Sequence, residues 1–293
     1  MLFSIYPYIS LLRPSQWVKN LLVFSPMVFA GAATEINSIL YSSVAFFLFC
    51  LNSGSVYILN DYNDIQRDRI HPTKRLRPLA SGEISKSASL VFLVVILSLM
   101  LTGASLLSVN FLLTTLGYFS LNILYTFRLK HVPWLDIISI STGFILRILA
   151  GAVAVGVSLS MWLIVNTFFL AALLGFGKRY HELLVLGSQA SETRPVLAFY
   201  KLKTLRDVLR SLPVIISLSF LGWCFAPDRL SGADPLLLAL TTPVITFALY
   251  RFYLICSSTE SKSSPTENML KDIPLIIASV IWSSSIILIF YFI

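Results

Sequence analysis

Charged residues are scarce in this sequence. Asp, Glu, Lys and Arg make up 12% of its 293 residues, whereas water-soluble domains carry about 25%. Hydrophobic residues make up 56%, and the mean hydropathy is +0.81. These values exclude a water-soluble globular protein. We expect an integral membrane protein that crosses the bilayer in helices of about 20 apolar residues.

Cysteine and the common catalytic signatures are also scarce or missing. The three cysteines (Cys50, Cys224 and Cys256) lie in apolar runs, without the CxxC or Cys/His spacing of a zinc or redox site. There is no Ser/His/Asp, GxSxG, GxGxxG or Walker pattern. No secretory signal is expected, because residues 1–12 lack a charged start and a cleavage site.

Apolar runs separated by helix breakers predict an all-α, polytopic membrane protein with nine transmembrane helices. The loops leave no room for a large soluble part, so we expect a single transmembrane domain over residues 1–293. The expected helices cover residues 18–33, 38–59, 87–107, 110–127, 135–156, 160–185, 208–226, 236–256 and 273–292.

The distribution of basic residues predicts the orientation. On the nine-helix interpretation, 20 of the 22 Lys and Arg residues fall on one side; Arg147 lies within a helix, and only Arg229 is on the other side. The positive-inside rule then predicts a multi-pass protein of the inner (plasma) membrane, with a cytoplasmic N-terminus and an external C-terminus. The net charge of +8 is expected to face anionic membrane lipids and not nucleic acid.

An acidic cluster follows the second apolar run directly. Asp61, Asp64 and Asp68 fall within about 60° of one another on a helix. Their mutual repulsion calls for a compensating cation. Two or three carboxylates with the Asn60 amide suit Mg²⁺, so these four residues are the expected catalytic and metal-binding group. The alternative is a solvated helix end neutralised by Arg67 and Arg69.

A basic segment comes next. Residues 71–82, HPTKRLRPLASG, place Lys74, Arg75 and Arg77 between two prolines that stiffen the loop. Basic side chains beside a metal site are what a diphosphate requires. The alternative is that these cations only anchor the loop to the cytoplasmic side of the membrane.

The pattern NDxxDxxxDR followed by HPxKRxRPLASG resembles the first aspartate-rich motif of the UbiA superfamily of intramembrane prenyltransferases. The resemblance implies a UbiA-like helical bundle with an active site that faces the cytoplasm. It also implies that Asp61, Asp64 and Asp68 hold Mg²⁺ on a diphosphate.

The second aspartate-rich motif of ordinary members is missing. Residues 177–183, GKRYHEL, stand at the matching place, and Lys178, Arg179 and Glu182 fall within about 100° of one helix face. Two cations there could bind a phosphate directly. The alternative is a cation pair that interacts with the helix dipole and with lipid phosphates.

Further stretches (residues 13–20, 129–136, 143–152 and 264–274) resemble one branch of the superfamily, the decaprenyl-phosphate phosphoribosyltransferases. The resemblance implies Mg²⁺-dependent transfer of 5-phosphoribose from phosphoribosyl pyrophosphate to a polyprenyl (decaprenyl-type) phosphate, with release of pyrophosphate. Lys19 and Lys130 lie in these stretches and join the expected substrate-binding residues.

Arg147 is expected deep in a helix, where an unpaired Arg costs at least about 2.5–3.5 kcal/mol. It lies eleven residues after Asp136 and close to the same helix face. We therefore expect it to pair with Asp136 or Glu182, or to bind substrate phosphate.

Two other functions remain open. A conventional UbiA prenyltransferase would move a prenyl group from its diphosphate to an aromatic acceptor, but it requires a second carboxylate cluster. A lipid-phosphate carrier would need polar residues through the bilayer depth, whereas the charges here gather on one side. The oligomeric state is also open, a homo-oligomer included.

Overall fold

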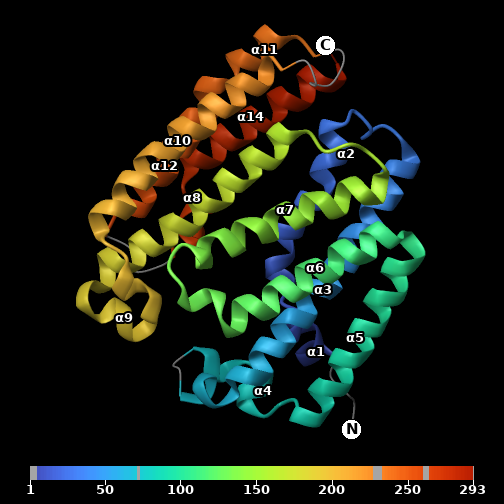
Figure 1. Ribbon diagram of the computed structural model, residues 1–293, viewed down its shortest axis with the longest axis vertical. Helices are drawn as coiled ribbons and strands as arrows, with labels where there is room; N and C mark the ends of the chain where they lie inside the picture. The colour runs from blue at the N-terminus through green and yellow to red at the C-terminus, as the bar shows by residue number, and fades with distance from the viewer. Residues whose placement is uncertain (1–4, 71–72, 227–232, 260–263, 293) are drawn as a thin grey trace. The chain divides into compact units, whose positions relative to one another are not determined.

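The computed structural model describes residues 5–70, 73–226, 233–259 and 264–292, and every regular element in these ranges is a helix (Figure 1). The expected His71 and Pro72 of the basic segment lie outside the described residues. The chain divides into two compact units, one of residues 1–127 and 146–158 and the other of residues 128–145 and 159–293. The boundary falls inside α7 (Leu135–Val155). A single domain over residues 1–293 stays a prediction.

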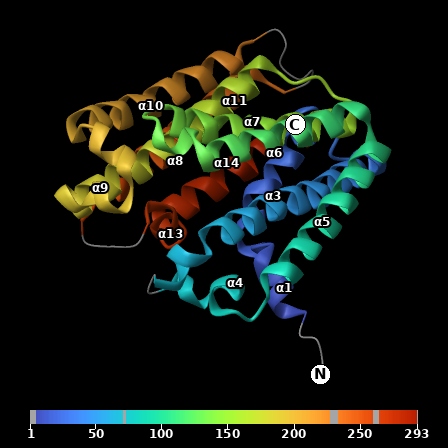
Figure 2. The same ribbon diagram turned by 60° about the horizontal axis from the view of Figure 1, so that its bottom comes forward.

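The first unit contains two long helices that run side by side, α3 and α5, with α4 near one end of them (Figures 1 and 2). Phe49 of α3 and Met100 of α5 are buried in one of its apolar clusters. Its elements before α7 are α1 (Tyr6–Leu11), η1 (Pro14–Phe24), α2 (Ser25–Phe29), α3 (Ile36–Ile70), η2 (Lys74–Leu76), α4 (Pro78–Ser81), α5 (Lys86–Leu107) and α6 (Val109–Phe127).

The first expected helix, residues 18–33, is wrong as a continuous α-helix. The 3₁₀ helix η1 and the short helix α2 replace it. Pro26 has no N–H to donate to the carbonyl of Leu22, and the Ser25 hydroxyl donates to that carbonyl instead at 2.7 Å. The segment also lies close to α7, since a Cβ atom on Gly151 would meet the Val23 carbonyl oxygen at 1.9 Å.

Helix α3 is longer than the expected 38–59. It continues to Ile70 and carries the acidic cluster on its last turns. The sequence has no helix breaker between residues 60 and 70, and a proline at position 72 disfavours helical backbone in the residue that precedes it. A 35-residue helix is about 50 Å long, which exceeds the bilayer core of about 30 Å. The acidic turns can therefore project beyond the apolar core.

Local hydrogen bonds end and begin the next helices of the first unit. Helix α4 is followed by Gly82, whose φ of +85° favours glycine. The Ser85 hydroxyl then accepts a hydrogen bond from Ala88 N at 3.1 Å and caps α5. The connection between α4 and α5, which follows the basic segment, is thus fixed at both of its helix ends.

The second unit is a group of long helices in which α8, α10, α12 and α14 pack side by side (Figure 1). Leu173 of α8, Leu205 and Leu209 of α10 and Phe252 of α12 are buried in its core. Besides the start of α7, its elements are η3 (Leu129–His131), α8 (Met161–Leu186), η4 (Gly187–Gln189), α9 (Ala190–Thr193), η5 (Pro195–Phe199), α10 (Leu202–Cys224), α11 (Pro235–Leu240), α12 (Thr242–Ser257), α13 (Pro265–Met269) and α14 (Ile273–Tyr291).

Seven helical stretches of the described chain are long and apolar enough to cross a membrane, which identifies a multi-pass membrane protein. Helix α6 and the 18–33 segment are not among the seven. The expected helix 208–226 begins earlier, at Leu202, and the expected helix 236–256 is divided near Thr241, just before Pro243. Nine crossings and the orientation of the termini stay predictions.

Candidate active site

The three aspartates of α3 differ in burial. Asp61 and Asp68 are each 3% exposed, whereas the side chain of Asp64 is 31% exposed. Asp68 follows Asp61 by seven positions, almost two full helical turns, so the two side chains share one helix face, with Asp64 beside it. The predicted common face is therefore present, but only two of its carboxylates are buried.

Arg77 joins the two buried carboxylates. Its Nη1 donates to Oδ1 of Asp61 at 3.0 Å and to Oδ2 of Asp68 at 2.7 Å. Nζ of Lys74 lies 4.0 Å from Oδ1 of Asp68. The structure thus brings two of the three predicted loop cations to the acidic cluster. Arg75 is exposed, and no hydrogen bond or ion pair of its side chain is found in the described part of the chain.

Arg13 also belongs to this cluster, although it was not predicted as a site residue. Its Nη2 donates to Oδ1 of Asp61 and its guanidinium lies 4.7 Å from the centre of the Tyr57 ring. Arg13 has a φ of +50° and precedes Pro14, a strained conformation that needs stabilising contacts. In the sequence, Arg13 was marked only by its place in residues 13–20, the stretch from which Lys19 was chosen as a substrate-binding residue.

Asn60 and Lys19 have other hydrogen bonds. The Asn60 side-chain oxygen accepts from Thr126 Oγ1 at 2.7 Å, which ties the end of α6 to α3. Lys19 is exposed and donates to Oε1 of Gln16 at 2.8 Å. The structure does not describe either side chain as bonded to the aspartates.

The donor atoms of the acidic cluster are of the kind that a divalent cation binds, but the three carboxylates are not grouped around one common position. Among the described residues, no three His, Cys, Asp or Glu side chains are grouped to hold a metal ion. However, oxygens of Asp61 and Asp68 converge on one cationic nitrogen, Arg77 Nη1. Hard oxygen donors that converge on one positive charge are the donor set that Mg²⁺ prefers. Asp64, 3.9 Å from Nη1 of Arg67, is the nearest further carboxylate along the helix.

Arg147 lies buried in the first unit, 6% exposed. Its Nε donates to Oδ1 of Asn20 at 2.9 Å and its Nη2 to the Tyr118 hydroxyl at 2.7 Å. Its guanidinium also lies 4.8 Å from the centre of the Tyr118 ring and 5.7 Å from that of Phe49. The structure thus buries Arg147, whereas its expected pairing with Asp136 or Glu182 and its contact with substrate phosphate stay predictions. The partners described for it include an amide and a phenol, which sequence spacing did not indicate.

The second predicted cluster lies in the second unit, at the end of α8. Arg179 is 2% exposed; its Nε donates to Oδ2 of Asp136 and its Nη1 to Oε2 of Glu182, both at 2.9 Å. Nε of Arg194 lies 3.6 Å from the same Glu182 oxygen. Arg179 was expected to bind a phosphate, but its guanidinium is already held by two carboxylates.

Tyr200 completes the environment of Asp136. Its hydroxyl donates to Oδ1 of Asp136 at 2.7 Å and accepts from the Trp134 backbone N at 2.7 Å. Burial, followed by the hydrogen bond to Asp136, raises the pKa of Tyr200 above its usual range, so the phenol stays protonated near neutral pH. Neither Tyr200 nor Arg194 was predicted: Tyr200 lies 64 residues from Asp136, and Arg194 lies beyond the end of α8, outside the helix face used for the prediction.

Lys178 differs from its neighbour Arg179. It is half-buried, and no hydrogen bond or ion pair of its side chain occurs among the described residues. Glu182, Arg194 and Glu267 are near enough to act on it electrostatically. Lys130 is also half-buried, in η3, and the described contacts give it no polar partner. Of the predicted cations of the second unit, these two amines have the fewest polar contacts.

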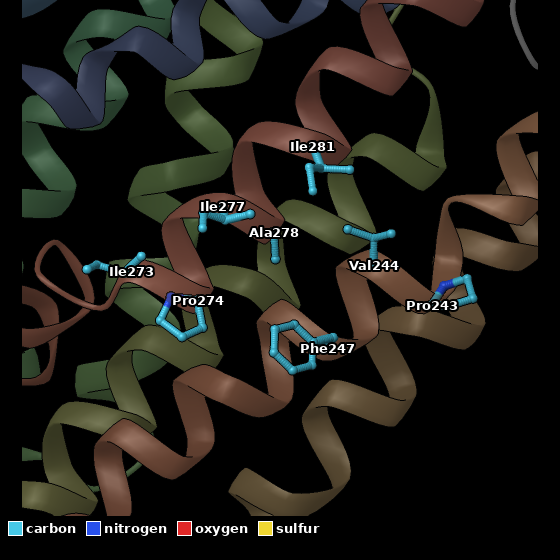
Figure 3. Close-up of a pocket in the computed structure, with 8 residues that line it drawn as sticks. All are labelled: Pro243, Val244, Phe247, Ile273, Pro274, Ile277, Ala278 and Ile281. Atoms are coloured by element: carbon cyan, nitrogen blue, oxygen red, sulfur yellow. The ribbon is translucent and has the colours of Figure 1, made fainter.

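An apolar groove lies between α12 and α14 of the second unit (Figure 3). Phe247 of α12 and Ile277 and Ile281 of α14 are about half exposed there, and none of the predicted site residues lines it. Exposed apolar side chains on membrane-crossing helices suit contact with lipid chains. Eight residues line the groove: Pro243, Val244, Phe247, Ile273, Pro274, Ile277, Ala278 and Ile281.

Comparison with known proteins gives agreeing results. The model of the UbiA prenyltransferase family matches residues 21–269. A relative from Corynebacterium glutamicum named decaprenyl-phosphate phosphoribosyltransferase is 34% identical over 97% of this chain and 86% of its own length. A relative of the same name from Mycolicibacterium smegmatis is 33% identical over 97% of this chain and 92% of its own.

The fold also resembles solved structures. A UbiA homolog from Archaeoglobus fulgidus bound to GPP and Mg²⁺ superposes with a TM-score of 0.72 at 20% identity, over 96% of each chain. The same homolog bound to DMAPP and Mg²⁺ gives 0.71 at 21% identity, over 98% of this chain and 99% of that one. At such low identity these likenesses establish the fold.

Proposed function

The chain belongs to the UbiA prenyltransferase family, and we propose that it transfers 5-phosphoribose from phosphoribosyl pyrophosphate to a polyprenyl phosphate of the decaprenyl type. Pyrophosphate is the second product. The relatives that share about a third of their residues over nearly the whole chain, and that bear the phosphoribosyltransferase name, carry this proposal. The chain is accordingly a UbiA-superfamily transferase.

The acidic cluster and the basic loop are assigned to the donor. Asp61, Asp64 and Asp68, helped by Asn60, would hold Mg²⁺, which when bound neutralises charge on the pyrophosphate group. Structures of the Archaeoglobus fulgidus homolog contain Mg²⁺ together with GPP or DMAPP, which supports a divalent metal here. Lys74, Arg75 and Arg77 would bind pyrophosphate oxygens directly.

These cations matter most as the bond to the pyrophosphate breaks. Oxocarbenium character then develops at the anomeric carbon of the ribose, and negative charge gathers on the departing oxygens. Guanidinium and ammonium groups fixed beside those oxygens stabilise the charge where it appears. Arg77, which already contacts two members of the cluster, is the best placed of them.

The second unit is assigned to the lipid phosphate. Lys178 offers an ammonium group beside a pre-formed ion-pair network, and Lys130 offers another. Arg179 and Glu182 would position that network, because Arg179 is held by Asp136 and Glu182. One acceptor oxygen would attack the anomeric carbon. A phosphate monoester is already ionised near neutral pH, so no strong general base is required.

The remaining predicted features are part of the same proposal. Arg147, with Asn20 and Tyr118, would shape the polar interior of the first unit, with Lys19 at its exposed edge. The isoprenoid tail would lie among apolar helices open to membrane lipid. The site would face the cytoplasm of an inner-membrane protein whose N-terminus is cytoplasmic and whose C-terminus is external.

A label-transfer assay tests the function. Purified protein is incubated with Mg²⁺, a polyprenyl phosphate and phosphoribosyl pyrophosphate labelled in the ribose. Labelled lipid in the organic phase that disappears with a chelator is the expected result. Label that stays in water, together with prenylation of an aromatic acceptor by a polyprenyl diphosphate, would instead identify a conventional prenyltransferase. Prenylation is measured alongside, because a UbiA homolog of the same fold was solved bound to GPP.

A further inference from the structure

Arg77 lies where the proposed function requires a metal ion. Its Nη1 is within 3.0 Å of an Asp61 oxygen and 2.7 Å of an Asp68 oxygen. The side chains of Asp61 and Asp68 are each 4% exposed, whereas the Arg77 side chain is 29% exposed. The guanidinium thus enters the carboxylate pair from the more open side of the cluster.

The charges of this cluster are balanced by arginines. Asp61 and Asp68 contribute two negative charges, and Arg77 and Arg13 contribute two positive charges in direct contact with them. Lys74 Nζ, 4.0 Å from an Asp68 oxygen, adds a further positive charge nearby. Buried carboxylates need such partners, because burial of an unpaired charge is strongly unfavourable. A divalent cation added to this arrangement would meet the guanidinium of Arg77 at close range and be repelled.

A diphosphate removes that conflict. It carries several negative charges and offers oxygens that suit a guanidinium. Arg77 belongs to the loop segment between η2 and α4, with extended backbone (φ −66°, ψ 143°). Rotation of its long side chain is enough to carry the guanidinium from the carboxylates to a neighbouring ligand.

We propose that Arg77 is an exchange residue: it neutralises Asp61 and Asp68 when no donor is bound, and it moves to the diphosphate when metal and diphosphate arrive together. The proposal rests on the diphosphate donor of the proposed function. It makes metal and diphosphate binding interdependent, so that metal alone binds weakly. Arg13, held over the Tyr57 ring, keeps its contact with Asp61 during the exchange.

Metal binding without turnover tests this exchange. Retention of radioactive Mn²⁺ is measured on full-length protein in lipid nanodiscs, with and without inorganic pyrophosphate, and corrected for empty nanodiscs. Wild type, Arg77→Gln, Arg77→Lys and Arg67→Gln are compared. Arg67→Gln is the matched control, because it removes a charge 3.9 Å from Asp64 on a side chain that is 83% exposed.

Arg77→Gln is expected to bind Mn²⁺ without pyrophosphate about 10-fold or more tightly than wild type, and to lose most of the pyrophosphate enhancement, within the usual range of coupling between two ligands. Arg77→Lys keeps the charge and should keep weak metal binding, as should Arg67→Gln. Gel filtration of each variant shows whether it is folded, and Arg77→Lys still tests the charge if Arg77→Gln is not.

The inference and the proposed function fail differently. If wild type and Arg77→Gln bind Mn²⁺ equally without pyrophosphate, and both gain from it, the exchange is wrong while the diphosphate site stands. If Arg67→Gln gains as much Mn²⁺ affinity as Arg77→Gln, the gain comes from the loss of any positive charge near the cluster, and the exchange is again overturned. Absence of Mn²⁺ binding under all conditions would overturn the metal site itself, and with it the inference.

Discussion

Arg179 and Asp136 form an ion pair that is almost completely shielded, with side chains 2% and 0% exposed and Nε 2.9 Å from Oδ2. The other Asp136 oxygen accepts from Tyr200 at 2.7 Å. The pair connects α7 with α8, and Tyr200, in the segment before α10, is hydrogen-bonded to the α7 member of the pair. Since each charge is neutralised inside the unit, the pair would act on the proposed lipid-phosphate site only through neighbouring side chains.

The first prediction follows from this burial. Arg179→Ala should lower the stability of the protein by about 3–5 kcal/mol, because it leaves the buried Asp136 carboxylate without its cation. Thermal unfolding in detergent measures the loss. Arg194→Ala is the control: its side chain is 31% exposed and 3.6 Å from Glu182, so about 1 kcal/mol or less is expected. A stable Arg179→Ala protein with reduced lipid affinity would instead assign Arg179 to the phosphate.

The second prediction concerns Lys178. Lys178→Ala should raise the KM for polyprenyl phosphate about 10-fold or more and leave the KM for phosphoribosyl pyrophosphate within about 2-fold, because only the acceptor phosphate loses a charge partner. Initial rates at varied lipid concentration measure it. Lys203→Ala on the exposed side of α10 is the control. An unchanged lipid requirement would mean that the acceptor site lies elsewhere.

Much of the first cluster could be predicted from sequence because its residues are local. Asp61, Asp64 and Asp68 lie on consecutive turns of α3, and Arg77 follows after one short loop. Helical periodicity fixes which carboxylates share a face. Arg13 could not be found this way, since its contact with Asp61 spans 48 residues.

The second cluster shows the same limit more strongly. Periodicity grouped Lys178, Arg179 and Glu182 correctly, and Arg179 does contact Glu182. It did not indicate that Asp136, 43 residues away, would hold the guanidinium. Sequence spacing indicates which residues can share a helix face, whereas packing between helices decides which of them are neutralised inside the protein.

The third prediction tests the least buried aspartate of the cluster. Asp64→Asn should reduce Mg²⁺-dependent turnover by about 100-fold or more, because the amide binds a hard cation far less well. The fold should be retained, because the ion pair described for Asp64 is a long one, 3.9 Å to the exposed Arg67, and Asp64 takes no part in the Arg77 bridge. Turnover is measured over a range of Mg²⁺ concentrations, with Glu83→Gln in the following loop as the control. Full activity of Asp64→Asn would restrict the metal ligands to Asp61 and Asp68.

The fourth prediction concerns pH and the start of α14. Asp272 accepts hydrogen bonds from Nε and Nη2 of Arg251 at 3.0 and 2.8 Å, and it caps the helix by accepting from Leu275 N at 3.0 Å. The hydrogen bond from Arg251 holds the pKa of Asp272 below its usual range. A carboxylate whose pKa is lowered by folding stabilises the protein above its unfolded pKa of about 4, and this contribution is lost as the pH falls through the folded value.

Asp272→Asn isolates the charge, because asparagine caps helices as well as aspartate. The melting temperature of Asp272→Asn should lie below that of wild type at about pH 6, and the difference should shrink toward about pH 3 as the wild-type carboxylate becomes protonated. Asp207→Asn is the control, since its partner Arg206 is 3.9 Å away and both side chains are largely exposed. A difference that stays constant with pH would mean that Asp272 acts through the cap geometry and not through its charge.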